Sequence, residues 1–129
     1  VNSRLEGYLS SIPTSSNCSS ELKDIMKYSV LAGGKRFRPI LTYTVASLFD
    51  TKIEIADSSA CAIELIHIYS LIHDDLPAMD DDDIRHNQSS SHKVFGEAQA
   101  ILAGDGLQAL AFSLISNDPV ILAEDATGI

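Results

Sequence analysis

The densest group of side chains that could do chemistry is a run of aspartates near the middle of the chain. Six of the 18 acidic residues fall between positions 74 and 83: Asp74, Asp75, Asp80, Asp81, Asp82 and Asp83. Carboxylates this close repel one another unless cations neutralise them. Carboxylate oxygens suit hard divalent cations, and Mg²⁺ commonly combines one or two carboxylates with substrate phosphates. For an acidic run alone, a solvated loop is the simpler interpretation. A calcium EF-hand loop is excluded, because the glycine and the closing glutamate are missing.

A second group of interest is the glycine-rich basic stretch GGKRFRP at residues 33–39. Two glycines let the backbone approach an anion closely, while Lys35 and Arg38 supply positive charge. Pro39 suits the first turn of a helix, whose amino end would add its positive dipole. The spacing does not fit a Walker phosphate-binding loop. Taken alone, a basic cluster is more often a surface patch.

The segment at residues 59–76 is apolar almost all round, which is typical of a central helix in a bundle. It nevertheless carries His67, His73, Asp74 and Asp75, and buried polar groups need a partner, a metal or a water-filled cavity. His67, Ser70 and Asp74 are spaced to share one helix face. We expect this face to line a polar cavity wide enough for a diphosphate.

Composition limits the class of protein. The chain of 129 residues is 45% hydrophobic, which fits a single globular domain over residues 1–129. Its net charge of −9 argues against nucleic-acid binding. No uninterrupted apolar run reaches the roughly 20 residues of a membrane span, and the first residues do not resemble a signal peptide. Two cysteines, Cys18 and Cys61, fit free thiols in a reducing compartment, so we expect a cytoplasmic protein.

The remaining pattern predicts an all-α fold of antiparallel helices joined by short loops. Helices are expected over residues 21–31 and 40–49, and over 59–76 with Asp57 and Ser58 as its cap. Two further helices, over 97–102 and 105–116, are expected to be separated at Gly104 or Gly106. A last helix could begin at 120–126. Residues 80–91 are interpreted as a loop, and no hairpin of strands is expected.

Taken together, the motifs resemble the trans-type polyprenyl diphosphate synthases, and most closely the bacterial farnesyl-producing kind. The resemblance rests on four stretches and covers roughly residues 27–117: GGKRFRP at 33–39, ELIHIYSLIHDD at 64–75, LPAMDDDD at 76–83 and FGEAQAILAGDG at 95–106. It implies an all-helical prenyl transferase that condenses isopentenyl diphosphate with an allylic diphosphate, dimethylallyl or geranyl, to give farnesyl diphosphate. It also implies Mg²⁺ as cofactor and a homodimer.

The resemblance also implies roles for individual residues. Asp74 and Asp80 would bind Mg²⁺ that bridges the allylic diphosphate, with Asp75 contributing through contacts around the metal. Lys35, Arg38 and His67 would hold isopentenyl diphosphate, and Arg85 would contact the allylic diphosphate. Tyr69, with Ser70 beside it, lies where an aromatic residue blocks longer products in the farnesyl-producing members. His73 is expected to be structural. His92 is interpreted as a loop residue and left unassigned, although the family often has a histidine there.

Two departures from the family pattern stand out. The aspartates are usually followed by Arg-Arg-Gly-x-Pro, but Arg85 is followed here by His86, Asn87, Gln88 and Ser89. His86 thus replaces an arginine that contacts isopentenyl diphosphate. We expect weaker binding that improves as pH falls from about 8 to about 6, unless His86 points into solvent. The second departure is that no further aspartate-rich motif follows Asp83, so we expect this chain alone to be inactive.

Two other functions compete with a catalytic synthase. A non-catalytic binding or dimerisation subunit derived from a synthase would keep the same motifs without turnover. A terpene cyclase would share an aspartate-rich motif but not the GGKRFRP stretch, so that stretch disfavours it. The intact mass of the native gene product would separate a fragment of a synthase from the non-catalytic subunit, because a product near twice this size favours the fragment.

Overall fold

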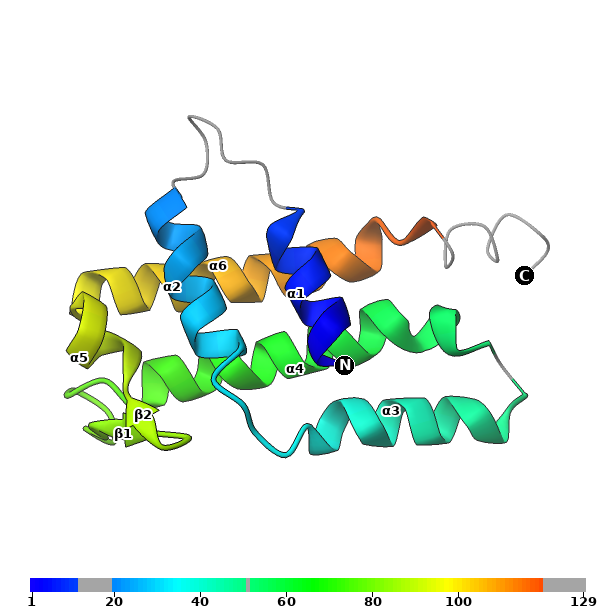
Figure 1. Ribbon diagram of the computed structural model, residues 1–129, viewed down its shortest axis with the longest axis horizontal. Helices are drawn as coiled ribbons and strands as arrows, with labels where there is room; N and C mark the ends of the chain where they lie inside the picture. The colour runs from blue at the N-terminus through cyan, green and yellow to red at the C-terminus, as the bar shows by residue number, and fades with distance from the viewer. Residues whose placement is uncertain (12–19, 51, 120–129) are drawn as a thin grey trace.

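The computed structural model describes residues 1–11, 20–50 and 52–119. Consecutive long helices alternate in direction along the chain, as Figure 1 shows for α3, α4 and α6. The elements are α1 (Asn2–Ser10), α2 (Ser20–Val30), α3 (Phe37–Leu48), α4 (Ile53–Asp74), β1 (Ile84–Arg85), β2 (Gln88–Ser89), α5 (Ser91–Phe95) and α6 (Glu97–Ser116). The predicted all-α antiparallel class is confirmed.

The core lies between α4 and α6, which make the most extensive contact in the described part of the chain. Helix α4 has 22 residues and is apolar on every side because α1, α2, α3 and α6 all contact it. Helices α1 and α2 cross the two long helices in the view of Figure 1. The largest fully buried side chains of this core include Leu5, Leu9, Ile25, Leu65 and Leu107.

Helix α4 begins six residues earlier than predicted, so Asp57 and Ser58 lie inside the helix and not at its cap. Both residues are buried. The Asp57 carboxylate is satisfied by other helices, because it accepts a hydrogen bond from the Tyr43 hydroxyl at 2.6 Å and pairs with Arg4 at 3.0 Å. The helix ends at Asp74, before Pro77.

The two helices predicted at the carboxyl side are one continuous helix, α6, and the expected break at Gly104 or Gly106 is wrong. Gly104 is buried where α6 crosses α4. A Cβ atom built on Gly104 would lie 2.3 Å from Nε2 of His73. Glycine at this position therefore provides room for close packing and does not interrupt the helix.

The predicted loop after the aspartates contains a small hairpin, which the sequence pattern did not reveal. Strands β1 and β2 pair antiparallel, with Ile84 opposite Ser89 and Arg85 opposite Gln88. The two residues between them, His86 and Asn87, both have positive φ, of 52° and 62°. Positive φ at both central positions is typical of the tight turn that joins two twisted strands.

Other differences lie at the ends of the chain and around the hairpin. Helices α1 and α5 were not predicted. The helix predicted over 21–31 corresponds to α2, and the one over 40–49 to α3, where Pro39 lies in the first turn as expected. Cys61 is buried and free, and its burial raises the pKa of the thiol to about 11. Cys18 and the helix expected at 120–126 lie outside the described residues.

Two described helices, α4 and α6, are long and apolar enough, by length and composition alone, to cross a membrane. The most apolar stretch is 56% buried within the protein in α4 and 28% buried in α6. The position of α4 among four other helices accounts for its apolar character. Helix α6 packs one face on α4 and leaves Ile101, Leu102, Phe112 and Ile115 exposed.

Candidate functional site

Four of the predicted substrate-binding residues lie around one hollow, although they come from three separate segments. This hollow, here called the cationic pocket, has a volume of about 350 Å³ and is lined by Gly34, Lys35, Arg36, Phe37, Arg38, Glu64, His67 and His86. The loop before α3 supplies Lys35, the first turn of α3 supplies Arg38, α4 supplies His67 and the hairpin turn supplies His86. Helix packing therefore brings together residues that are far apart in the sequence.

The loop before α3 takes a backbone path that glycine permits most easily. Gly33 and Gly34 have φ of 108° and 128°, and Arg36 follows in the left-handed region. A Cβ atom built on Gly34 would lie 3.4 Å from Nε2 of His86, so the hairpin turn reaches the glycine loop. His86 is exposed, yet it lines the pocket.

The floor of the cationic pocket is a buried ion pair that the sequence analysis did not identify. Arg36 Nη1 donates to Glu64 Oε1 at 2.8 Å, with the two side chains only 8% and 4% exposed. Arg36 also donates to the carbonyl oxygen of Val30 at 2.6 Å and to Asn2 Oδ1 at 2.9 Å. This pairing neutralises Arg36 locally and leaves Lys35 and Arg38, both exposed, as the cations available to an anion. Glu64 could have been noticed, because a charge on an apolar helix requires a partner.

The electrostatic surroundings of His67 fit an anion site. Burial, followed by the positive charge of Arg38, lowers the pKa of His67 below the usual histidine value, while Glu64 acts in the opposite direction. The fold therefore favours the neutral ring, and a bound anion would reverse that preference. His67 and Asp74 were expected to line one cavity, but Asp74 is not among the residues of the cationic pocket.

The aspartate run folds back on the carboxyl end of α4. The amide of Asp80 donates to the carbonyl of Asp74 at 2.7 Å, and the amide of Asp82 donates to the carbonyl of Asp75 at 3.1 Å. These bonds hold Asp74 and Asp80 at the same helix end, although the two residues would not share a face of a regular helix. Within the described residues, neither carboxylate has a hydrogen bond or ion pair. Both are thus available to a cation.

Asp75 is occupied by Arg85. Arg85 Nη2 lies 2.6 Å from Asp75 Oδ1 and its Nε lies 3.3 Å from Oδ2, and Asp75 is only 3% exposed. The hydrogen bond to Asp75 raises the pKa of Arg85, so the guanidinium stays cationic. This forked contact fits a supporting role for Asp75 near the predicted metal ligands. It also fixes Arg85 on the first strand of the hairpin.

The remaining predicted residues lie along the last turns of α4. Tyr69 is partly buried, packs against the core and makes an edge-to-face contact with His73, at 5.6 Å between ring centroids. His73 Nε2 lies 3.1 Å from the carbonyl oxygen of Ile101 on α6, which fits its predicted structural role. Ser70 donates its hydroxyl to the carbonyl of His67 at 2.6 Å.

His92 is not the loop residue that the sequence indicated. It lies in α5, is 6% exposed, and neither ring nitrogen has a hydrogen-bond partner within the described residues. Among those residues, His92, Asp81 and Asp83 form a set whose potential ligand atoms lie within 4.8 Å of one another. Asp74, Asp75 and Asp80 do not converge in this way. The roles of those three aspartates therefore stay predictions.

Comparison with known proteins supports the family resemblance that the motifs predicted. A model of the family described as polyprenyl synthetase matches residues 19–126. The chain is 47% identical over 117 residues to farnesyl diphosphate synthase from Escherichia coli (strain K12), covering 91% of this chain and 38% of that protein. It is 52% identical over 96 residues to a chloroplastic geranylgeranyl pyrophosphate synthase from Catharanthus roseus, covering 74% of this chain and 27% of that protein. The chain thus spans well under half the length of these relatives.

Solved structures agree in fold as well as in sequence. The chain superimposes on the crystal structure of geranyltransferase from Legionella pneumophila with a TM-score of 0.85 and 45% identity. That match covers 91% of this chain and 41% of the crystallised chain. The predicted resemblance is confirmed: with the matched family model and these relatives, this chain belongs to the polyprenyl synthetase family.

Proposed function

We propose that this chain forms the isopentenyl diphosphate-binding part of a prenyl transferase that condenses isopentenyl diphosphate with an allylic diphosphate. One observation carries the proposal: Lys35, Arg38, His67 and His86 come from three segments and line one pocket. Fixed cations and N–H donors of this kind bind a diphosphate through charge-assisted hydrogen bonds. Family membership supports the reaction class, and the named relatives are prenyl diphosphate synthases.

The described residues also fit Mg²⁺ as cofactor. Asp74 and Asp80 offer carboxylate oxygens at one helix end, and neither carboxylate is paired with another described residue. Hard oxygen donors of this kind suit Mg²⁺, which would complete its shell with water and substrate phosphates. When bound, the ion would neutralise charge that develops on the departing diphosphate.

The protein's own part in the reaction is positioning and charge stabilisation. Lys35 and Arg38 would bind the diphosphate of isopentenyl diphosphate, and His67 would donate a further hydrogen bond once protonated. Arg85 keeps Nη1 outside its pairing with Asp75 and could reach the allylic diphosphate. Cations fixed in advance stabilise the leaving diphosphate more in the transition state than in the ground state. No protein nucleophile is required.

A chimeric enzyme tests the function. The matched segment of the Escherichia coli farnesyl diphosphate synthase is replaced by this chain, and condensation is measured with and without Mg²⁺. We expect Mg²⁺-dependent transfer, and a loss of roughly ten- to a hundredfold in affinity for isopentenyl diphosphate for Lys35→Gln and for Arg38→Gln. Lys52→Gln, at the opposite end of α4, is the matched control. A folded chimera without turnover would contradict the proposal. So would a chimera whose affinity for isopentenyl diphosphate is unchanged by both substitutions.

The proposal also specifies the length of the product. Farnesyl diphosphate is the product we propose, because the family resemblance assigns to Tyr69 the role of limiting the growing chain. Tyr69 is also packed against His73. The named relatives include both farnesyl and geranylgeranyl synthases, so family membership alone does not fix the length. Tyr69→Ala in the chimera should lengthen the products analysed by chromatography, and an unchanged product profile would refute the assignment.

Two further features belong to the same proposal. We expect a homodimer, supported by apolar side chains that the described residues leave exposed on α3 and α6, such as Leu48 and Phe112. Sedimentation of the chimera at twice the monomer mass would agree, and a strictly monomeric active chimera would not. A cytoplasmic location is expected from the cysteine content, and cell fractionation of the native protein tests it.

A further inference from the structure

The position of His92 requires an explanation that the prenyl transferase reaction does not supply. Its ring is 6% exposed, and neither Nδ1 nor Nε2 has a hydrogen-bond partner within the described residues. Leaving a buried polar group without a partner is costly. A buried imidazole in this position therefore needs a partner for its ring nitrogens.

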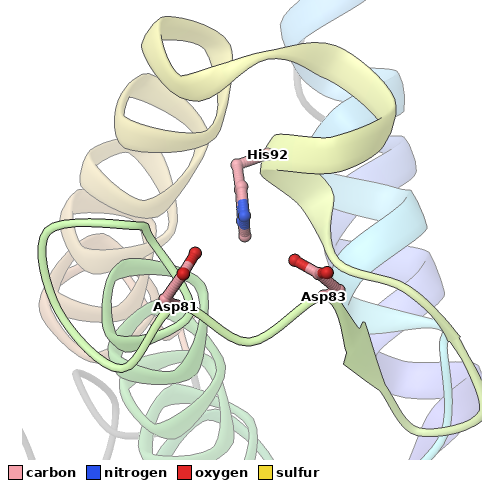
Figure 2. Close-up of side chains that lie close together, drawn as sticks. All are labelled: Asp81, Asp83 and His92. Carbon is pink, nitrogen blue, oxygen red and sulfur yellow. The ribbon is translucent and has the colours of Figure 1, made fainter.

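Figure 2 shows what the ring faces. The imidazole of His92 points into the space between the carboxylates of Asp81 and Asp83, which approach from the loop before β1. One potential ligand atom from each of the three residues lies within 4.8 Å of the other two. Asp81 and Asp83 are exposed, so their carboxylates can adjust.

The backbone around this group is tied down. The Asp81 amide donates to the carbonyl of Leu76 at 3.1 Å, and the Ser90 amide donates to the carbonyl of Asp83 at 2.8 Å. The Ser90 hydroxyl donates to the carbonyl of Asp82 at 2.7 Å. These bonds hold the aspartate loop against the start of α5, so the three side chains face one another because of the fold.

We propose that Asp81, Asp83 and His92 form a second metal site, which takes a first-row transition-metal dication such as Zn²⁺. Imidazole suits these metals, whereas Mg²⁺ favours all-oxygen ligands. Zinc bonds to histidine nitrogen and carboxylate oxygen are about 2.0–2.2 Å long. The exposed carboxylates would thus move inward by roughly an ångström, and water would fill the remaining coordination position.

The bound metal would hold the aspartate loop to α5 and so fix the hairpin that carries Arg85 and His86. Lys93 is the competing partner, because its Nζ lies 3.3 Å from Asp83 Oδ1. That ion pair is solvent-exposed and therefore weak, so a dication can displace it or share the carboxylate. This site is separate from the proposed Mg²⁺ ligands, because Asp74 and Asp80 take no part in it.

The test is a calorimetric titration of the untagged 129-residue chain with Zn²⁺ in a buffer free of phosphate and diphosphate. We expect one saturable site whose affinity falls at least about tenfold in Asp81→Asn, Asp83→Asn and His92→Gln. Asp24→Asn, which changes an exposed carboxylate on α2, is the control and should leave this affinity within about threefold. Circular dichroism checks that each variant is folded, and the exposed aspartate variants decide the outcome if His92→Gln does not fold.

A spectroscopic measurement identifies the ligand directly. With ¹⁵N-labelled histidine, Zn²⁺ should shift the ring nitrogen signals of His92 and leave those of His67, His73 and His86 in place. Three results would each overturn the proposal: the absence of saturable binding, which would leave buried water as the partner of His92; equal affinity in both aspartate variants; or binding that shifts no His92 signal.

Discussion

Arg36 differs from its neighbours in the basic loop because its charge is used inside the protein. Lys35 and Arg38 are exposed, whereas Arg36 is 8% exposed and bound to Glu64, Val30 and Asn2. A buried ion pair is weak evidence of stabilisation in itself, but removing one partner leaves an uncompensated buried charge. The basic stretch at 33–39 thus joins a structural arginine to two cations that face the pocket.

This difference can be measured by unfolding in urea. Arg36→Met should lower the free energy of unfolding by roughly 3–5 kcal/mol, because Glu64 would stay buried without a partner. Lys93→Met removes the exposed pair with Asp83 and should cost no more than about 1 kcal/mol. Combining Arg36→Met with Glu64→Leu should recover part of the loss. Equal effects of Arg36→Met and Lys93→Met on the free energy of unfolding would show that the buried pair matters no more for stability than the exposed one.

His67 gives the pocket a dependence on pH. Burial and Arg38 lower the pKa of His67 in the folded chain, so the fold favours the neutral ring. Its contribution to stability is fully present above the unfolded value of about 6.5 and is lost as pH falls through the lowered pKa. A bound diphosphate acts in the opposite direction, since it favours the protonated ring.

We therefore expect His67 to strengthen anion binding as the solution is made more acidic. In calorimetric titrations with inorganic diphosphate, His67→Gln should weaken binding about tenfold at pH 6 and much less at pH 8. Diphosphate itself titrates in this range, so the comparison is between the two proteins at each pH. Parallel pH profiles for the two proteins would show that His67 does not bind the anion.

Gly104 shows how tightly α6 packs on α4. Alanine is favoured over glycine inside a helix by about 1 kcal/mol, so Gly104→Ala would stabilise an isolated helix. Here the added Cβ would lie 2.3 Å from a ring held by Tyr69 and by the carbonyl of Ile101. Overpacking of this kind costs roughly 1–3 kcal/mol, so we expect net destabilisation in urea unfolding.

Gly106→Ala is the matched control on the same helix. The nearest atom there is Met26 Sδ, 3.3 Å from an added Cβ, and a flexible thioether can move aside. This variant should be neutral or slightly stabilising. His73→Ala should relieve the cost of Gly104→Ala in a double-mutant cycle. Similar stabilities for the two glycine variants would mean that the His73 ring moves away freely.

The elements that the sequence predicted well are those whose patterns are local. The apolar run of α4 and the basic stretch before α3 could be placed from periodicity and turn residues. The start of α4 could not, because Asp57 looks like a cap until Arg4 and Tyr43 are seen to satisfy its carboxylate. Helix α1 was missed because it buries only Leu5 and Leu9.

The candidate site, too, could be predicted only in part. Lys35, Arg38 and His67 were identified from residue type and motif, but their convergence on one pocket with His86 depends on long-range packing. The hairpin was missed because the usual glycine of its turn is absent. Asn87 stands where the family usually has glycine, and it still adopts a φ of 62°. Asparagine tolerates positive φ better than most residues, so the turn is retained.

Many large apolar side chains of the described residues are exposed. Phe37, Leu48, Phe49 and Ile53 on α3 and around the α3–α4 connection, and Phe112 on α6, are each more than 60% exposed. Several large apolar side chains left exposed in this way favour an interaction surface. The chain also spans only 38% of the Escherichia coli relative. Both observations support the proposal that catalysis needs protein surface beyond the residues described.

This chain by itself is not expected to catalyse the condensation. The 129-residue chain carries the cationic pocket and one aspartate run, and no second aspartate-rich motif follows Asp83. Positioning of two substrates can lower the activation barrier by roughly 7–11 kcal/mol. Stabilisation of the charge that develops in the transition state lowers the barrier further. Both would be incomplete here.

We expect the chain to bind inorganic diphosphate, and Lys35→Gln to weaken that binding, without condensing isopentenyl and dimethylallyl diphosphates. Extraction of radiolabelled prenyl product measures this, with the chimera as positive control. Mg²⁺-dependent turnover by the chain alone would show that it already holds a complete site.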